Sequence, residues 1–149
     1  MQKPISVMIH HTGVSHKLNS DQFMANNSYH EKKWHFKSSL GFYLGYTYEI
    51  SRRGYVRQAR AHGERTAACY QKDLNSGQCV HIALDGNFEI ENPAPNEIYA
   101  LRDLLRLLVA CFNIKKPAIF FHRQFSNTKC PGKNMDLRFI RSLIDIKKA

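Results

Sequence analysis

The sequence lacks any long apolar run, and this absence limits the kind of protein it encodes. Its 149 residues contain no stretch approaching the ~20 apolar residues that a membrane-spanning helix needs. The first residues, Met1–Val7, have no apolar core of a signal peptide, which predicts synthesis in the cytoplasm. Internal repeats and low-complexity linkers are also missing. At this length the simplest organisation is one domain over residues 1–149.

Cysteine is scarce, and its spacing argues against a small zinc-finger scaffold. The four cysteines are Cys69, Cys79, Cys111 and Cys130. They form no CxxC pair, which such scaffolds need. Cys111 falls on an apolar helical pattern, which predicts a buried thiol. Cys69 and Cys79 flank one loop, where free thiols are the favoured interpretation and a disulfide is the alternative.

Acidic residues are few relative to basic ones. Lys and Arg total 22 against 12 Asp and Glu, a formal charge of +10. Such a balance favours polyanionic partners: nucleic acid, an anionic membrane surface or an anionic cell-wall polymer. Charge alone does not choose among them. Hydrophobic residues make up 43% of the chain, which is typical of a globular domain.

Hydrophobic periodicity predicts strands and helices that interleave along the chain. Strands are expected at Ile5–Ile9, Leu44–Ser51, Tyr55–Ala59, Cys79–Leu84 and Pro117–Phe121. Helices are expected at about Ser20–Ser38, with Ser20 as N-cap, at Glu97–Phe112 and at Asp136–Ile146. The second and third strands flank Arg-Arg-Gly and form a hairpin, so the sheet mixes parallel and antiparallel pairs. The predicted fold class is α/β, a mixed β-sheet with helices packed on its faces.

The eight histidines differ in their setting. Three stand at the ends of predicted strands, where functional loops begin: His10, His11 and His122. His81 lies inside a strand and His62 in a glycine-flanked loop. The other three lie in polar surroundings, which favours solvated side chains: His16, His30 and His35. Imidazole and thiolate are preferred zinc ligands, so His122 with Cys130 eight positions later indicates two ligands and requires a third.

Several short motifs follow one another in an order that resembles a known family. They are Ile9-His10-His11-Thr12, Gly45-Tyr46, Ala61-His62-Gly63, and His122-Arg123 with Thr128-Lys129-Cys130-Pro131-Gly132. This order resembles the zinc-dependent type 2 N-acetylmuramoyl-L-alanine amidases. That family includes phage lysozyme-like amidases and animal peptidoglycan recognition proteins. The resemblance extends from about Ile5 to Ile146.

The resemblance implies one Zn²⁺ per chain, held by His10, His122 and Cys130. Three protein ligands leave zinc an open position for water, whose pKa falls to about 7. Attack on an amide carbonyl then produces an oxyanion that needs a donor. By position, Tyr46 and Thr128 are the candidate catalytic side chains.

Other positions carry weaker implications. The candidate substrate-binding residues are His11, His62 and Lys129, and His62 is equally a candidate partner of a metal ligand. The choice between Thr128 and Lys129 as the side chain that meets the substrate stays open. For Tyr46 the alternative is core packing on a strand face shared with Tyr48.

The chain also departs from the family pattern. Thr47 follows Gly-Tyr where many members have His or another aromatic residue, and the loop Glu64–Gln78 is longer than usual. His81 replaces a glycine in the strand that often reads Ile-Gly-Ile. Some branches place a catalytic glutamate at the position of Ala83, so the glutamate-dependent variant of the mechanism is not expected here.

The function implied is hydrolysis of the amide between N-acetylmuramic acid and L-alanine of peptidoglycan, as in a phage endolysin acting on the wall. A cytoplasmic enzyme that recycles muropeptides fits equally well. A non-catalytic peptidoglycan-binding module is a further alternative, although such members typically lack the cysteine that Cys130 supplies. A regulator that binds another protein is a third. The expected partner is peptidoglycan, with no nucleic acid, and the expected state is a monomer.

Overall fold

A five-stranded sheet forms the centre of the computed structural model, which describes residues 2–16, 21–69 and 71–146. Its strands are β1 (Ser6–His11), β2 (Tyr48–Ile50), β3 (Val56–Gln58), β4 (Cys79–Leu84) and β5 (Ile119–Phe121). They lie in the order β3-β2-β4-β1-β5. β1 is parallel to β4 and β5, β2 is parallel to β4, and β3 is antiparallel to β2. The predicted mixed sheet is confirmed.

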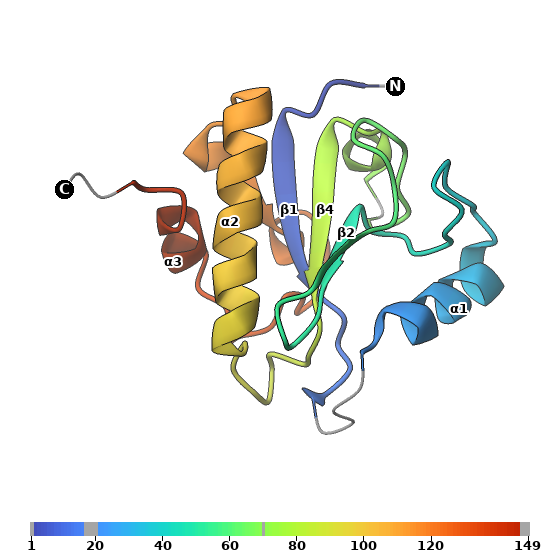
Figure 1. Ribbon diagram of the computed structural model, residues 1–149, viewed down its shortest axis with the longest axis horizontal. Coiled ribbons are helices and arrows are strands. Elements are labelled where there is room, and N and C mark those ends of the chain that lie inside the picture. Colours follow the sequence, from blue (N-terminus) through green and yellow to red (C-terminus); the bar gives the residue numbers. More distant parts are fainter. Residues whose placement is uncertain (1, 17–20, 70, 147–149) are drawn as a thin grey trace.

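In the described ranges, three α-helices accompany the sheet: α1 (Phe23–Trp34), α2 (Pro95–Phe112) and α3 (Leu137–Ser142). α2 packs along one face of the sheet (Figure 1). Its apolar stripe, at helical spacing, is Leu101, Leu104, Leu105 and Leu108. These side chains meet those that β1, β2 and β4 direct to the same face, and together they form the main core. Among the described residues, no helix is long and apolar enough to cross a membrane.

Several predicted boundaries were wrong. α1 begins at Phe23 and ends at Trp34, because His35 turns into the left-handed region at φ 50°. The proposed cap Ser20 lies outside the described residues. The predicted strand Leu44–Ser51 shrinks to β2, because its first residues form a loop that leaves the sheet. The last helix is also shorter than predicted, with Asp136 as its cap.

The thiols also differ from the prediction in one respect. Cys111 is exposed rather than buried. The apolar stripe of α2 continues from Leu108 to Phe112, which packs against the core, and so leaves Cys111 on the flank of the last turn. Cys69 and Cys79 are free thiols, as favoured.

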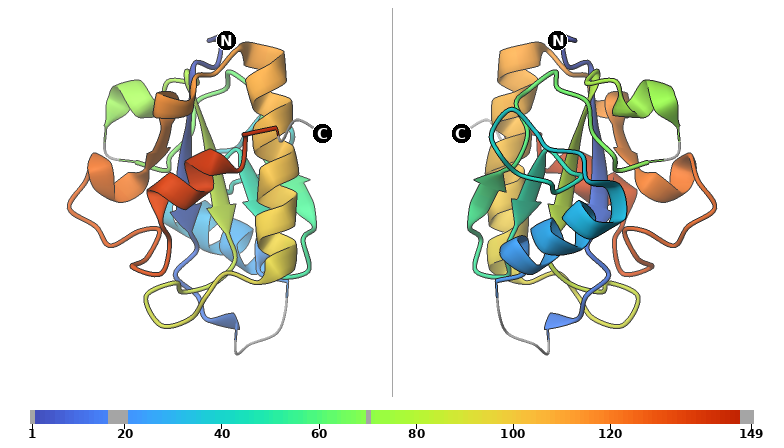
Figure 2. Two further views of the ribbon diagram at one scale, coloured as in Figure 1. Left: turned by 90° about the vertical axis from the view of Figure 1, so that its left-hand side faces the viewer. Right: turned by 90° about the vertical axis from the view of Figure 1, so that its right-hand side faces the viewer.

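β1 runs two residues further than predicted and therefore includes His10 and His11. Because side chains alternate along a strand, Val7 and Ile9 join the core beneath α2 while His10 lies on the opposite face. The segment that follows β5, drawn in orange, lies beside the edge of the sheet that β5 forms (Figure 2). The pairing of β1 with β4 and β5 thus brings later parts of the chain to the end of β1.

Candidate metal centre

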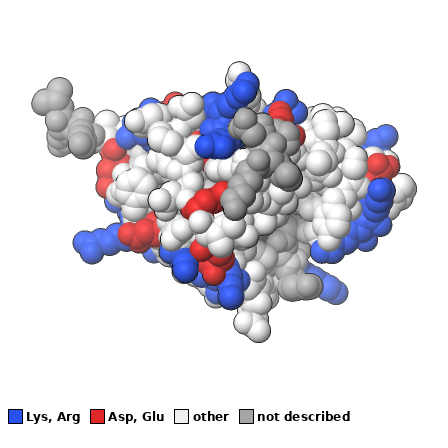
Figure 3. Space-filling model, turned by 90° about the horizontal axis from the view of Figure 1, so that it is seen from below, with Lys and Arg blue, Asp and Glu red and all other residues white. Residues whose placement is uncertain are grey.

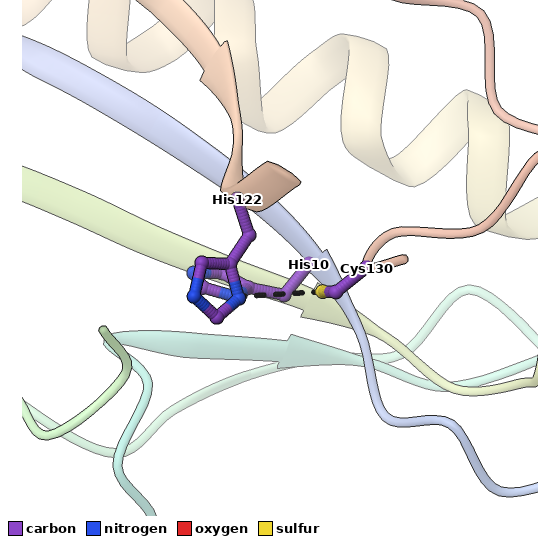
Figure 4. A group of neighbouring side chains, drawn as sticks. All are labelled: His10, His122 and Cys130. Atoms are coloured by element: carbon purple, nitrogen blue, oxygen red, sulfur yellow. Dashed lines mark hydrogen bonds between the residues drawn. The ribbon is translucent and has the colours of Figure 1, made fainter. Parts of the chain in front are cut away.

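Three potential metal ligands converge from separate parts of the chain. His10 comes from β1, His122 follows β5 directly, and Cys130 lies in the loop beyond (Figure 4). The ligand atoms of these three residues all lie within 4.8 Å of one another. The Nδ1 atom of His10 is 3.7 Å from the Sγ of Cys130. The cluster therefore has the spacing and donor types of a metal site.

The backbone fixes the position of Cys130. The Arg123 N–H donates to the Cys130 carbonyl at 3.0 Å, which closes the loop. The His11 N–H points at the Cys130 Sγ at 3.4 Å. Gly132 then lets the chain pass Phe88, since a Cβ on this glycine would lie 2.4 Å from the Phe88 carbonyl carbon. Its φ of +101° also favours glycine.

Burial keeps the imidazoles of the cluster neutral. It lowers the pKa of His10 well below its usual value, and the neighbouring His81, His122 and His11 lower it further. Burial likewise lowers the pKa of His122. The pKa of the Cys130 thiol rises to about 12 for the same reason. Neutral imidazoles present the lone pairs that a metal requires, and a bound cation favours the thiolate.

An open cleft of about 620 Å³ adjoins the cluster, and His122 forms part of its wall. Its aromatic lining consists of Tyr29, Trp34, Phe36 and Tyr46, and its basic lining of Lys33, Arg65 and Lys72. A smaller cavity of about 270 Å³, near Arg52 and Asp85, shares no lining residue with the cleft.

Tyr46 faces the cluster rather than the core beneath α2. Its ring centroid lies 5.0 Å from that of His10, and it lines the cleft. The preceding Gly45 allows this path, because a Cβ there would lie 2.9 Å from the Trp34 ring. Burial raises the pKa of Tyr46, and the nearby Cys130 adds to the rise. The phenol therefore stays protonated at neutral pH and can act as a donor.

The prediction of solvated side chains was wrong for His30 and His16, although His35 is exposed as predicted. His30 is buried on α1, where its Nδ1 accepts a hydrogen bond from the Gly45 N–H at 2.8 Å. Asn27, one turn earlier, accepts from the backbone of the same loop. α1 thus packs through polar residues that hold the Tyr46 loop. Asn27 and His30 are three positions apart and therefore share one face of the helix. That spacing was the signal in the sequence that could have indicated a polar packing face.

His11 and His62 lie away from the three ligand atoms. The His11 Nδ1 accepts from the Phe88 N–H at 3.1 Å, and its ring lies on the opposite side of β1 from the His10 ring. The His62 ring hydrogen-bonds the hydroxyl of Tyr48 and packs edge-on against Phe112, with centroids 5.1 Å apart. Both contacts are on the α2 side of the sheet.

Thr128 and Lys129 flank the cysteine in the loop. The Thr128 hydroxyl accepts from the Cys130 N–H at 3.3 Å, so it contacts the ligand's backbone. Lys129 is exposed. Neither residue lines the cleft described above.

A family model described as N-acetylmuramoyl-L-alanine amidase matches residues 1–133. The chain belongs to the N-acetylmuramoyl-L-alanine amidase family. This match covers most of the chain and confirms the predicted family and, with it, the amidase class of activity. No curated protein matches by sequence.

Solved structures with the same fold come from bacteria and insects. The N-acetylmuramoyl-L-alanine amidase LysC from Clostridium intestinale URNW aligns with a TM-score of 0.78 at 23% identity, over 97% of this chain and 87% of that one. Drosophila peptidoglycan recognition protein SA aligns with a TM-score of 0.73 at 26% identity, over 91% and 77%. The complex of peptidoglycan recognition proteins LCa and LCx, solved with tracheal cytotoxin, aligns with a TM-score of 0.76 at 24% identity. The alignment covers 95% of this chain and 83% of that one. These likenesses confirm the fold.

Proposed function

We propose that this amidase depends on zinc and hydrolyses the bond between N-acetylmuramic acid and L-alanine in peptidoglycan. The observation that carries the proposal is the cluster of His10, His122 and Cys130 beside an open cleft. Family membership supplies the reaction class, and the cluster supplies the means to perform it.

The donor set fits zinc. Two imidazoles and one thiol are ligands that zinc favours, and three such ligands are typical of catalytic sites. The Nε2 atom of His122 is buried and has no hydrogen-bond partner among the described residues. A buried polar atom of this kind is costly unless something binds it, and a metal satisfies it. Zinc held there supplies Lewis acidity and activates water near neutral pH.

Tyr46 is the side chain best placed to assist the reaction. Its protonated phenol lies beside the cluster and lines the cleft, so it can donate a hydrogen bond to the oxyanion that forms from the amide carbonyl. Thr128 stays a candidate, although its bond to the Cys130 N–H favours a role in holding the loop. Lys129 stays a candidate for substrate binding from the loop.

The cleft lining suits a glycopeptide. Lys33, Arg65 and Lys72 can attract the carboxylates of a stem peptide, and Tyr29 and Trp34 offer apolar faces. On the face that Figure 3 shows, Lys and Arg side chains are dispersed, with acidic side chains between them. This dispersion favours recognition of peptidoglycan within the cleft over binding of nucleic acid along an extended basic surface. We infer a monomer of one domain, acting on the wall as an endolysin does.

Zinc content and wall clearing test the proposal together. Purified protein should contain about one zinc per chain, and it should clear a suspension of purified wall. Removal of the metal with a chelator should stop clearing, and added zinc should restore it. A metal-free protein with full activity would contradict the proposal. Wall that is bound but never cleared would indicate a recognition module instead, whereas activity on soluble fragments alone would indicate recycling.

A further inference from the structure

His81 is a completely buried histidine in the centre of the sheet, at a position where the resembled family often has glycine. In the parallel pairing of β4 with β1, its partner is Met8, and the partner of His10 is Ala83. The side chains of paired residues point to the same face, so His81 lies beside His10. The ring centroids of His10 and His81 lie 5.1 Å apart.

The hydrogen bonds of His81 allow one assignment of protons. Its Nε2 lies 2.6 Å from the carbonyl oxygen of Leu74, and a carbonyl only accepts, so this nitrogen carries the proton. In the neutral ring the Nδ1 atom of His81 is then an acceptor, and it lies 2.8 Å from the Nε2 of His10. The Nε2 of His10 must therefore donate. The remaining nitrogen of His10, its Nδ1, keeps a lone pair and is the atom that lies nearest Cys130.

The far end of this chain of bonds is anchored in the cleft wall. Leu74 belongs to the short 3-10 helix Lys72–Asn75. The Asn75 side chain accepts from the Thr66 hydroxyl at 2.9 Å and from the Ala68 N–H at 3.1 Å. Thr66, Ala68 and Asn75 line the cleft. Their hydrogen bonds fix the turn that carries the Leu74 carbonyl.

Two further hydrogen bonds, both through the His81 backbone, place His81 relative to Tyr46. The His81 N–H donates to the Thr47 hydroxyl at 3.1 Å, and the Thr47 N–H donates to the His81 carbonyl at 2.9 Å. Thr47 directly follows Tyr46. Two of the positions at which the chain departs from the family pattern, Thr47 and His81, thus contact each other beside the site.

We propose that His81 is a positioning residue for the metal ligand His10, an inference that rests on the zinc site proposed above. It fixes the tautomer of His10, so that the lone pair of Nδ1 would be available to a metal, and it holds the ring through the bond to Leu74. Partners of this kind raise ligand basicity and orient the ring, and their loss typically costs roughly 10–100-fold in metal affinity.

Two substitutions separate the two side-chain hydrogen bonds of His81, one to His10 and one to Leu74. His81→Phe keeps the ring but removes both bonds, and we expect its zinc dissociation constant to rise roughly 10–100-fold in competition with a chromophoric chelator. His81→Asn keeps an acceptor near the position of Nδ1 but cannot reach Leu74, so its zinc dissociation constant should lie between those of the unsubstituted protein and His81→Phe. The matched control is Met8→Leu, a buried change of similar volume on the same face, which should leave zinc affinity unchanged.

Side-chain ¹⁵N NMR of the metal-free protein gives a readout independent of activity. We expect protons on the Nε2 atoms of both His10 and His81, and a mixture of His10 tautomers in His81→Phe. Zinc affinity of His81→Phe within twofold of the unsubstituted protein would overturn the inference, as would a proton on the Nδ1 of His10 in the unsubstituted protein. If His81→Phe does not fold, the spectrum of the unsubstituted protein decides the matter, because a proton on the Nε2 of His10 supports the inference and one on its Nδ1 overturns it. A protein that folds but binds no zinc contradicts the proposed function instead, and the tautomers still test the pair.

Discussion

The Nδ1 atom of His10 lies 3.7 Å from the Sγ of Cys130, although 120 positions separate the two residues in the chain. The pairing of β1 with β5 makes this possible, because it carries the chain back to the end of β1 before the cysteine loop begins. Only the folded sheet brings the two atoms together. Metal binding and folding are therefore expected to be coupled.

Removal of the thiol should abolish metal binding. In Cys130→Ala the cluster keeps two imidazoles, too few to hold zinc firmly, so zinc content should fall well below one per chain and wall clearing should be lost. Elemental analysis of the dialysed protein and a turbidity assay measure the two effects. The control is Cys111→Ser, an exposed thiol on α2. A Cys130→Ala protein that retains stoichiometric zinc would show that the thiol is not a ligand.

Loss of the Tyr46 hydroxyl should reduce the rate without releasing zinc. Tyr46→Phe preserves the ring beside His10 and removes the donor, so kcat should fall roughly 10²–10³-fold with little change in KM. Kinetics on a soluble muropeptide, together with zinc analysis, measure this. The control is Tyr55→Phe, since Tyr55 is exposed and lies outside the cleft. Full activity in zinc-loaded Tyr46→Phe would remove Tyr46 from the mechanism.

Arg60 should be a major stabilising residue of the loop that carries Tyr46. It is fully buried, and its guanidinium donates to the carbonyls of Leu44 at 2.7 Å and Phe36 at 2.6 Å. Arg60→Met leaves these acceptors unsatisfied, so the free energy of unfolding should fall by about 3 kcal/mol. Urea denaturation measures this change, with the exposed Arg53→Met as control. Equal stability in the two variants would refute the assignment.

Stability should decrease with pH because of a buried pair of carboxyl groups. Burial raises the pKa of Glu49, and a hydrogen bond to Asp85 raises it further. A carboxyl whose pKa is raised on folding stabilises the protein below its unfolded value of 4.5, and this contribution is lost as the pH rises. Above pH 4.5 the free energy of unfolding should therefore fall by up to about 1.4 kcal/mol for each pH unit. Glu49→Gln should abolish this dependence on pH.

Denaturation at several pH values tests the carboxyl pair. The matched control is Asp103→Asn, because the Asp103 side chain is 69% exposed on α2 and should leave the slope unchanged. An unaltered slope in Glu49→Gln would mean that Glu49 does not titrate with folding. The chemistry at the metal cluster is not involved, so metal-free protein is suitable.

The hydrophobic pattern predicted the sheet and α2 because both bury apolar side chains in a regular period. It indicated α1 but not its ends or its inward face, which carries Asn27 and His30 to bond the backbone of a loop. A helix that packs through polar bonds gives no apolar stripe, and its ends could not be placed from periodicity. The left-handed turn at His35 had no glycine to mark it.

The proposed ligands were indicated by motif order, and the structure brings all three together. Their surroundings were not predictable from the sequence. His81 was seen only as a histidine in place of glycine, because its bonds to His10 and Leu74 depend on strand register. The predicted strand alternation placed Tyr46 with Tyr48, and it was wrong there because the chain leaves the sheet before β2.

Digestion of purified peptidoglycan, with mass spectrometry of the products, tests the central claim most directly. The zinc-loaded protein should release free stem peptides that begin with L-alanine and leave glycan strands with intact lactyl groups. The same digestion with a chelator, or with Cys130→Ala, should release none. Products cut within the glycan or within the peptide, or release that persists when zinc is removed, would contradict a zinc amidase built on His10, His122 and Cys130.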